Sequence, residues 1–176
     1  MFPDTFRTAR VALRPIAAVD VAAIFEAYAQ DAEVTRFMTW RPHRSRGDTE
    51  DYVARCIATP ADVARTYMIV GAADGAVRGA FELRGITPFR VDVGYVLARA
   101  WWRQGLMSEV LSEAVRWAMG QARVFRIGSV CDVENIGSAR VMEKAGMVRE
   151  GVLRRWIMHP NISDEPRDCF SYARVR

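Results

Sequence analysis

The 176-residue chain has few of the residues from which metal sites and disulfide frameworks are built. Its three cysteines, Cys56, Cys131 and Cys169, are odd in number and lack the paired spacing of a zinc site. Its two histidines, His43 and His159, lie far apart in sequence. The sequence therefore predicts no metal site, and its cysteine usage fits a reducing cytoplasm.

Long hydrophobic runs are absent as well. No stretch approaches the roughly 20 apolar residues that span a bilayer, and the segment MFPDTFRTAR has no apolar region of the signal-peptide kind. We therefore expect that the protein has no membrane partner. With 51% hydrophobic and 26% charged residues, the composition is that of a globular protein, and the length suits a single domain over residues 1–176.

Lysine is almost missing, although the chain is basic. Of the 25 basic residues only Lys144 is a lysine, and the arginines are scattered along the chain. No run of basic residues is interleaved with stacking aromatics, so the net charge of +4 does not predict a nucleic-acid surface. Abundant arginine and alanine instead indicate a GC-rich, bacterial genome.

What the sequence does contain is an alternation of strand and helix patterns without a repeat or a linker. Strands are expected over residues 7–16, 67–72, 77–86, 91–97, 125–131, 147–158 and 167–175. Helices are expected from Asp20 to about Gln30, from Asp48 or Thr49 to about Ala58, over 106–120, and within 132–146. The order β-α-α-β-β-β-α-β-α-β-β predicts a mixed α/β or α+β sheet, in which antiparallel strands precede a βαβ unit.

The segment WWRQGLMSEVLSEAVRWAMG places Gly105 where an irregular run becomes an amphipathic helix. A helix start exposes unpaired N–H groups and the positive end of the helix dipole. Gly105 would let the backbone approach an anion closely, and Arg99 and Arg103 add positive charge. The segment favours phosphate binding, with an ordinary turn as the alternative. It lacks the residues of a P-loop and of a dinucleotide fingerprint.

A second segment, CDVENIGSARVMEKAGMVREGVLRRW, places Asn135 and Ser138 three residues apart at the next helix start. Taken alone, Asn135 can be an N-cap and Ser138 a first-turn hydroxyl. Taken together, the two segments resemble the GNAT N-acetyltransferase superfamily, and most closely its ribosomal-protein-alanine N-acetyltransferase (RimJ/RimL-like) branch. The branch pattern N-x-x-S-x-x-x-x-x-K-x-G-F-x-x-E-G is matched here by Asn135, Ser138, Lys144, Gly146, Glu150 and Gly151, with Met147 in place of Phe.

The likeness runs from about Arg7 to the end of the chain, and VDVGYVLARAWW and EPRDCFSYARVR also resemble strands of this branch. It implies a mostly antiparallel, splayed sheet flanked by helices, with acetyl-CoA as cosubstrate. Pantetheine would bond the backbone of Tyr95, Val96 and Leu97. The pyrophosphate would meet the N–H groups of Arg103, Gln104, Gly105, Leu106, Met107 and Ser108. Asn135 would bond pantetheine, and Ser138 would lie near the thioester.

The chain departs from the superfamily's phosphate motif, Q/R-x-x-G-x-G/A, at two positions. Trp102 takes the Q/R position and Met107 takes the G/A position. Backbone N–H groups bind the phosphate, so Trp102 is compatible with the motif. At the G/A position, Met107 is compatible with the motif if its side chain points into the core, and its place in the apolar stripe of the helix predicts this orientation.

Acetyl transfer to an amine needs a base for the amine and a proton for the leaving thiolate. Asp92 is the first candidate base, because the alternation in VDVGYVL puts it on the face opposite the apolar residues. Glu82 is the second candidate, and a cross-strand or surface carboxylate is the alternative for each. Ser138 is the candidate proton donor, with Tyr95 and Tyr172 as alternatives. Direct transfer fits the family better than an acyl-cysteine intermediate.

The resemblance places a loop carrying Met38, Trp40 and His43 over the acceptor, opposite a hairpin that carries Trp156. These residues predict an acceptor pocket without naming the acceptor. The favoured acceptor is a protein N-terminal α-amine. A small-molecule amine (an antibiotic, a polyamine or an amino acid) and a non-catalytic acyl-CoA-binding module are the alternatives, and a homodimer is left open.

Overall fold

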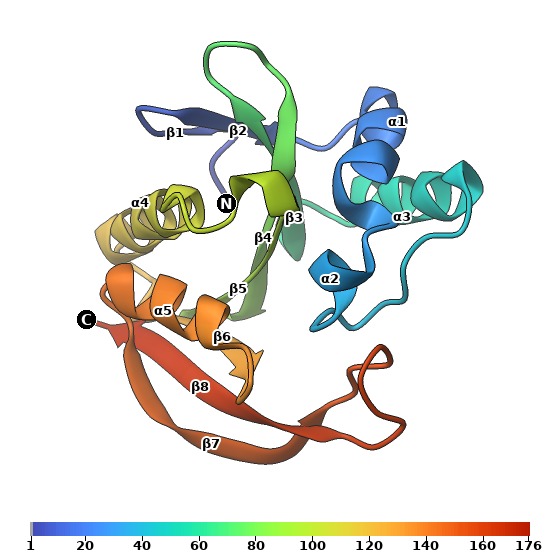
Figure 1. The fold of residues 1–176 in the computed structure, drawn as a ribbon. Coiled ribbons are helices and arrows are strands. Elements are labelled where there is room, and N and C mark those ends of the chain that lie inside the picture. The colour runs from blue at the N-terminus through green and yellow to red at the C-terminus, as the bar shows by residue number, and fades with distance from the viewer. Residues whose placement is uncertain (1) are drawn as a thin grey trace.

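The computed structural model describes residues 2–176, which form an eight-stranded sheet with helices on both faces (Figure 1). The strands are β1 (Phe6–Arg7), β2 (Val11–Pro15), β3 (Ala64–Gly71), β4 (Val77–Thr87), β5 (Arg90–Leu97), β6 (Arg126–Asp132), β7 (Val148–Ile157) and β8 (Arg167–Val175). Their order across the sheet is β1-β2-β3-β4-β5-β6-β8-β7. Only β5 and β6 pair in parallel, so the mixed, mostly antiparallel sheet is confirmed.

The helices are α1 (Val21–Ile24), α2 (Ala32–Thr35), α3 (Arg46–Ala58), α4 (Leu106–Gly120) and α5 (Ile136–Lys144). Helices α1 and α3 cover one face of the sheet, which we call the α3 face, and α4 and α5 cover the other, the α4 face (Figure 1). In β5, Val91 and Val93 pack in the α4-face core, whereas Val96 packs against the α3-face core. The predicted alternation of this strand is therefore confirmed.

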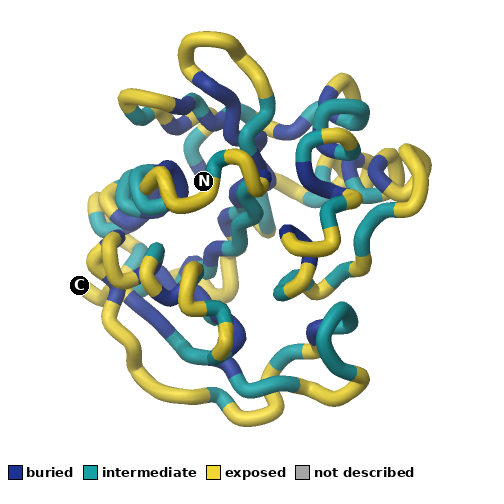
Figure 2. The backbone as a smooth tube through the Cα atoms, in the orientation of Figure 1, coloured by how far each residue is buried: buried dark blue, intermediate teal, exposed yellow. Residues whose placement is uncertain are grey.

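The core lies between the sheet and each helix layer, and Figure 2 shows the buried residues along the central strands. Strand β7 is the exception, because it is an edge strand and is mostly exposed. Met107 is only 4% exposed and packs in the α4-face core. The prediction that its side chain points inward, away from any ligand at the helix start, is confirmed.

Two local predictions near the N-terminus are wrong. The strand expected over residues 7–16 is two short strands, because Thr8 turns the chain through a bond from its N–H to the Val11 carbonyl. Asp20 does not cap α1; its carboxylate instead accepts from the Arg14 guanidinium and the Ala17 N–H. The helix expected over 20–30 is present as an unbroken helical segment, which consists of a 3-10 turn (Ala18–Asp20), α1 and a π-helical turn over Phe25–Ala29.

The helix expected from Asp48 or Thr49 begins earlier, at Arg46. Ser45 is its N-cap, and its hydroxyl accepts from the Asp48 N–H at 3.4 Å. The Asp48 carboxylate bonds back to the Ser45 N–H, which completes a capping box and explains the earlier start. Helix α2 was not predicted, because four residues are too few to show a helical period.

Strands β5 and β6 are neighbours over only three residue pairs, which end at Asp92 and Gly128. Beyond this point β5 continues along β4 to Leu97, while β6 continues along β8 to Asp132. The two strands therefore part. We call this opening the β5–β6 fork and define it by residues 93–97 and 129–132. It is the splay that the resemblance implied.

Two further predictions concern absences. Within residues 2–176, no helix combines the length and apolar character needed to cross a bilayer. The same residues hold no group of three or more His, Cys, Asp or Glu side chains placed as metal ligands would be. Each of the three cysteines is a free thiol.

Candidate active site

Helix α4 begins without a side-chain cap, because its N-cap is Gly105. Gly105 has a φ of 77° and Arg103 a φ of 59°, so the loop turns through left-handed conformations just before the helix. The first N–H groups of a helix have no partner inside it. The N–H groups of Leu106, Met107 and Ser108 are thus left for an external acceptor at the positive end of the dipole, which suits a phosphate.

Arg10 holds this loop in place from the turn between β1 and β2. Its guanidinium donates to the Gln104 carbonyl at 2.9 Å and to the Glu109 carboxylate at 2.8 Å. Arg10 is not predictable from the sequence, because its partners lie more than 90 residues away and no local pattern indicates such a contact. Arg10 fixes the backbone of the loop against the first turn of α4.

The backbone of β5 divides its hydrogen bonds between β4 and the fork. Ala98 donates its N–H to Arg78 on the β4 side, and alternation then directs the N–H and C=O of Val96 to β4 as well. Tyr95 and Leu97 direct theirs into the fork. The Leu97 carbonyl already accepts from the indole N–H of Trp102 at 2.7 Å. Both groups of Tyr95 and the N–H of Leu97 therefore remain for an extended ligand.

Two hydroxyls meet across the fork. The Tyr95 hydroxyl lies 2.7 Å from the hydroxyl of Ser138 at the start of α5, and the Tyr95 ring stacks on Phe81 at 6.5 Å between centroids. Burial raises the pKa of Tyr95, so its hydroxyl keeps its proton. Asn135 is the N-cap of α5, since its side-chain oxygen accepts from the Ser138 N–H at 3.1 Å. Its side-chain NH2 is not used by this cap.

Tyr172 and Cys131 are less suited to proton donation and to nucleophilic attack, respectively. The Tyr172 hydroxyl donates to the Glu143 carboxylate at 2.8 Å within the α4-face core, so its proton is already held by that carboxylate. Burial raises the pKa of the Cys131 thiol to about 12, so little thiolate forms near neutral pH. A neutral, buried thiol is a weak nucleophile, which disfavours an acyl-cysteine intermediate.

Both candidate bases lie on the α3 face. Asp92 is at the last paired position before the fork, and both of its carboxylate oxygens accept from the Arg90 guanidinium, at 2.9 and 2.8 Å. Glu82 lies opposite Gly94, beside the start of the fork. One of its oxygens accepts from the Thr66 hydroxyl at 2.9 Å, and the other is 3.3 Å from Arg84.

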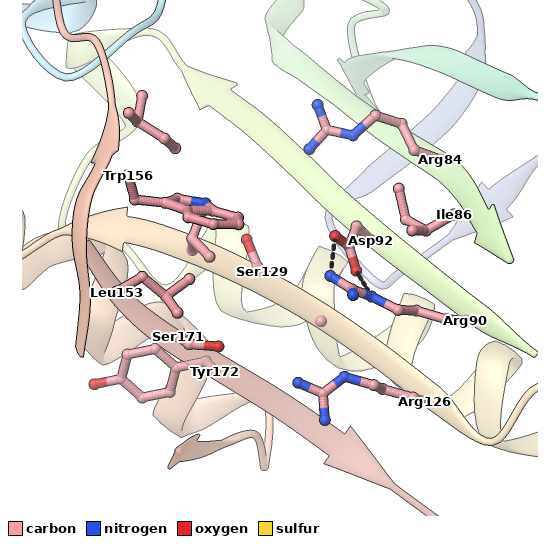
Figure 3. A pocket seen from close by; sticks show the side chains of 13 residues that line it. Arg84, Ile86, Arg90, Asp92, Arg126, Ser129, Leu153, Trp156, Ser171 and Tyr172 are labelled. Carbon is pink, nitrogen blue, oxygen red and sulfur yellow. Dashed lines mark hydrogen bonds and ion pairs between the residues drawn. The ribbon is translucent and has the colours of Figure 1, made fainter. Parts of the chain in front are cut away.

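A cavity of about 240 Å³ opens beside Asp92 on the α3 face (Figure 3). Asp92 and Gly128 line it, and Leu153 and Trp156 of β7 lie across it from Arg84 of β4. Asp92 and Trp156 were predicted from the sequence, and the structure brings them to one cavity. The three arginines that also line it were not predicted, because arginines are scattered over the whole chain.

The other predicted acceptor residues do not line this cavity. The His43 ring nitrogen Nδ1 lies 2.8 Å from the Thr49 hydroxyl, and the Trp40 ring packs 5.0 Å from the His43 ring. Met38 lies nearby in sequence on the same loop. Asn161, from the β7–β8 loop, donates to the carbonyls of Thr35 and Trp40 at 2.6 and 2.8 Å. The loop of residues 36–44 is thus bound to the β7–β8 loop.

A protein-family model described as an acetyltransferase (GNAT) domain matches residues 10–148 of the chain. The chain belongs to the GNAT acetyltransferase family. The uncharacterized N-acetyltransferase YoaA of Bacillus subtilis (strain 168) is 30% identical to it over 186 residues, and the match covers 100% of this chain and 99% of that protein. The enzyme is therefore an acetyltransferase.

Solved GNAT structures share its fold. The RimL ribosomal L7/L12 α-N-protein acetyltransferase, in complex with coenzyme A, has a TM-score of 0.83 and 21% identity, with 96% of this chain and 95% of that chain covered. The spermidine N-acetyltransferase of Vibrio cholerae, with CoA and spermine, has a TM-score of 0.77 and 17% identity, with 96% of each chain covered. These two enzymes are named for different acceptors, so the shared fold leaves the acceptor of this GNAT enzyme open.

Proposed function

We propose that this GNAT enzyme transfers the acetyl group of acetyl-CoA directly to the α-amine of a protein N-terminus. The observation that carries the proposal is the β5–β6 fork, which joins an uncapped helix start on the α4 face to a cavity on the α3 face. A donor and an acceptor can approach the fork from opposite sides of the sheet and meet within it.

The residues around the fork fit acetyl-CoA. The N–H groups of the first turn of α4, after Gly105, suit the pyrophosphate. Tyr95 and Leu97 offer backbone groups to pantetheine, as an edge strand offers them to an added strand. The side-chain NH2 of Asn135, which its cap bond leaves unused, would donate to the same arm. Acetyl-CoA would supply the thioester whose carbonyl carbon the amine attacks.

The reaction needs two proton transfers, and a different group beside the fork would carry out each of them. As the new C–N bond forms and the C–S bond breaks, a carboxylate on the α3 face, Glu82 or Asp92, would take the proton of the amine. The Tyr95–Ser138 hydroxyl pair would supply the proton to the departing thiolate. An α-amine has a pKa near 7.7–8.0, against about 10.4 for a lysine-type amine. Carboxylates that already accept from Thr66 and Arg90 suit the less basic acceptor.

Acetyl-CoA should stabilise the fold, by about 2.7 kcal/mol at a free concentration of about 100 times its Kd. Gly105→Val should weaken acetyl-CoA binding at least about tenfold, because a β-branched residue resists a φ of 77° and the loop must rearrange. Thermal melts and calorimetric titration measure both effects. The matched control is Gly75→Val. Gly75 lies in the β3–β4 turn with a similar φ of 65°, so this variant carries the same kind of backbone strain away from the α4 loop and should leave the Kd for acetyl-CoA unchanged.

An unchanged Kd for Gly105→Val would mean that the phosphates bind elsewhere. If acetyl-CoA produces no stabilisation at all, this chain does not use it as donor, and the proposed function fails at its first step.

The acceptor is tested by CoA release with three compounds: a Ser-initiated peptide, spermidine, and the same peptide with its N-terminus blocked by acetylation. The free peptide should exceed spermidine at least about tenfold in kcat/KM, a difference of about 1.4 kcal/mol in transition-state binding. The blocked peptide should be inert. A preference for spermidine would instead assign the enzyme to small-molecule amines.

A further inference from the structure

Three arginines, Arg84, Arg90 and Arg126, line the α3-face cavity (Figure 3). Two of them are held by carboxylates of the protein. Arg90 donates through two nitrogens to Asp92, and Arg126 through two nitrogens to Glu150. Because each pair is bidentate, these two guanidinium groups are largely neutralised within the protein.

Arg84 is bonded differently. Within residues 2–176 its carboxylate contact is a single approach of 3.3 Å to Glu82, and its hydrogen bond to the Val93 carbonyl is long, at 3.5 Å. Its side chain is 47% exposed. A guanidinium has five N–H donors in a planar fork. Arg84 therefore brings unused donors and an incompletely balanced charge to the cavity.

The position of Arg84 places this charge beside the start of the β5–β6 fork. Arg84 lies opposite Asp92 in the β4–β5 ladder, and its guanidinium lies over Gly94. A Cβ at Gly94 would be 3.4 and 3.7 Å from its two terminal nitrogens, so the glycine leaves room for it. Figure 3 shows the guanidinium directed into the cavity, on the side opposite Trp156.

We propose that Arg84 binds a carboxylate of the acceptor, so that the enzyme prefers protein N-termini with Asp or Glu at the second position. This inference rests on the proposed function. With the α-amine at the fork beside Glu82, the side chain of the next residue enters the cavity where Arg84 has free donors. A planar carboxylate matches the guanidinium in a bidentate pair. The α-carboxylate of a free amino acid could form the same pair with Arg84, so the test below includes a free amino acid.

Three further arginines lie on a loop that contacts the β7–β8 loop. Arg36, Arg41 and Arg44 lie exposed on the loop that Asn161 binds to the β7–β8 loop, and no ion pair to a carboxylate occupies them among the described residues. Positive charge on this loop would raise the local concentration of an acidic chain and speed its association. This attraction falls as ionic strength rises.

The test compares two peptides that differ only at the second residue, Ser-Glu and Ser-Gln, together with free glutamate. Wild-type enzyme should show kcat/KM about tenfold higher for the Glu peptide, as expected for a charge-assisted hydrogen bond to the acceptor. Arg84→Met should abolish this ratio, and Arg84→Lys should retain part of it. Because the ratio is taken within one enzyme, a general loss of activity in the variant cancels out. Arg126→Met is the matched control and should keep the ratio, since Glu150 already saturates Arg126.

Equal kcat/KM for the two peptides in the wild type would overturn the Arg84 inference and leave the proposed function standing. A ratio that survives Arg84→Met would overturn it as well. If free glutamate exceeds both peptides, the carboxylate belongs to an amino acid acceptor and the preference for acidic N-termini is refuted. Turnover of small amines with none of either peptide would refute the proposed function itself.

Discussion

Tyr95→Phe should lower kcat about 10²-fold, the low end of the range for general acid–base catalysis. The substitution keeps the ring that stacks on Phe81 and removes only the hydroxyl that lies 2.7 Å from Ser138. Burial raises the pKa of Tyr95 above its usual value near 10, so the hydroxyl is protonated throughout an assay from about pH 6.5 to 9.5. The loss should therefore be independent of pH. Single-turnover CoA release measures it without interference from product dissociation.

Ser138→Ala distinguishes a hydroxyl pair from a single donor. If the two hydroxyls act as one unit, Ser138→Ala should also lose about 10²-fold, and the double variant should be about as slow as the slower single variant. Two losses that multiply would contradict a shared role. The KM for acetyl-CoA should change little in all three variants, because the backbone groups of Tyr95 and Leu97 remain.

Tyr172→Phe is the control for removing a buried tyrosine hydroxyl. Its hydroxyl donates to Glu143 in the α4-face core, so the substitution should cost about 1 kcal/mol of unfolding free energy. Its kcat should stay within about twofold of the wild type. A comparable fall in kcat would mean that the effect of Tyr95→Phe reports loosened packing rather than proton donation.

The sequence predicts the parts of this site that depend on local periodicity. The apolar stripe of α4 places Met107 in the core, and Gly105 marks the helix start, because both follow from helical geometry over a few residues. The alternation in β5 likewise puts Asp92 on the face opposite Val91 and Val93. To predict these features, it is enough to know whether a segment is a helix or a strand and to apply the period of that element.

The features that escaped prediction depend on which distant residues meet. The bonds of Arg10 to the α4 loop and the position of Arg84 over Gly94 follow from strand register, which no local pattern specifies. Trp40 and His43 suggested an acceptor pocket because aromatic residues were close in sequence. In the fold these two rings pack on each other and do not line the cavity beside Trp156, and their role in acceptor binding stays a prediction.

The two candidate bases differ in their hydrogen-bond and ion-pair partners. Asp92 accepts from Arg90 through both oxygens, whereas Glu82 has one hydrogen bond from Thr66 and one longer contact to Arg84. An acceptor carboxylate that binds Arg84 would draw this guanidinium away from Glu82 and free one of its oxygens. Glu82 also lies opposite Gly94, nearer the open part of the fork. We therefore propose Glu82 as the base and Asp92 as the residue that fixes Arg90.

Glu82→Gln should then lower kcat/KM about 10²-fold at about pH 6.5, where an α-amine with a pKa near 8 is largely protonated and needs the base. The loss should shrink to a few-fold at about pH 9.5, because the amine is then deprotonated in water before it binds. Asp92→Asn should cost less than about tenfold at both pH values, since it weakens one ion pair without removing the proton acceptor. The measurement is the pH profile of kcat/KM for both variants with a Ser-initiated peptide. A pH-dependent loss confined to Asp92→Asn would return the role of base to Asp92. A pH-independent loss in Glu82→Gln would mean that neither carboxylate takes the proton directly and that water does so.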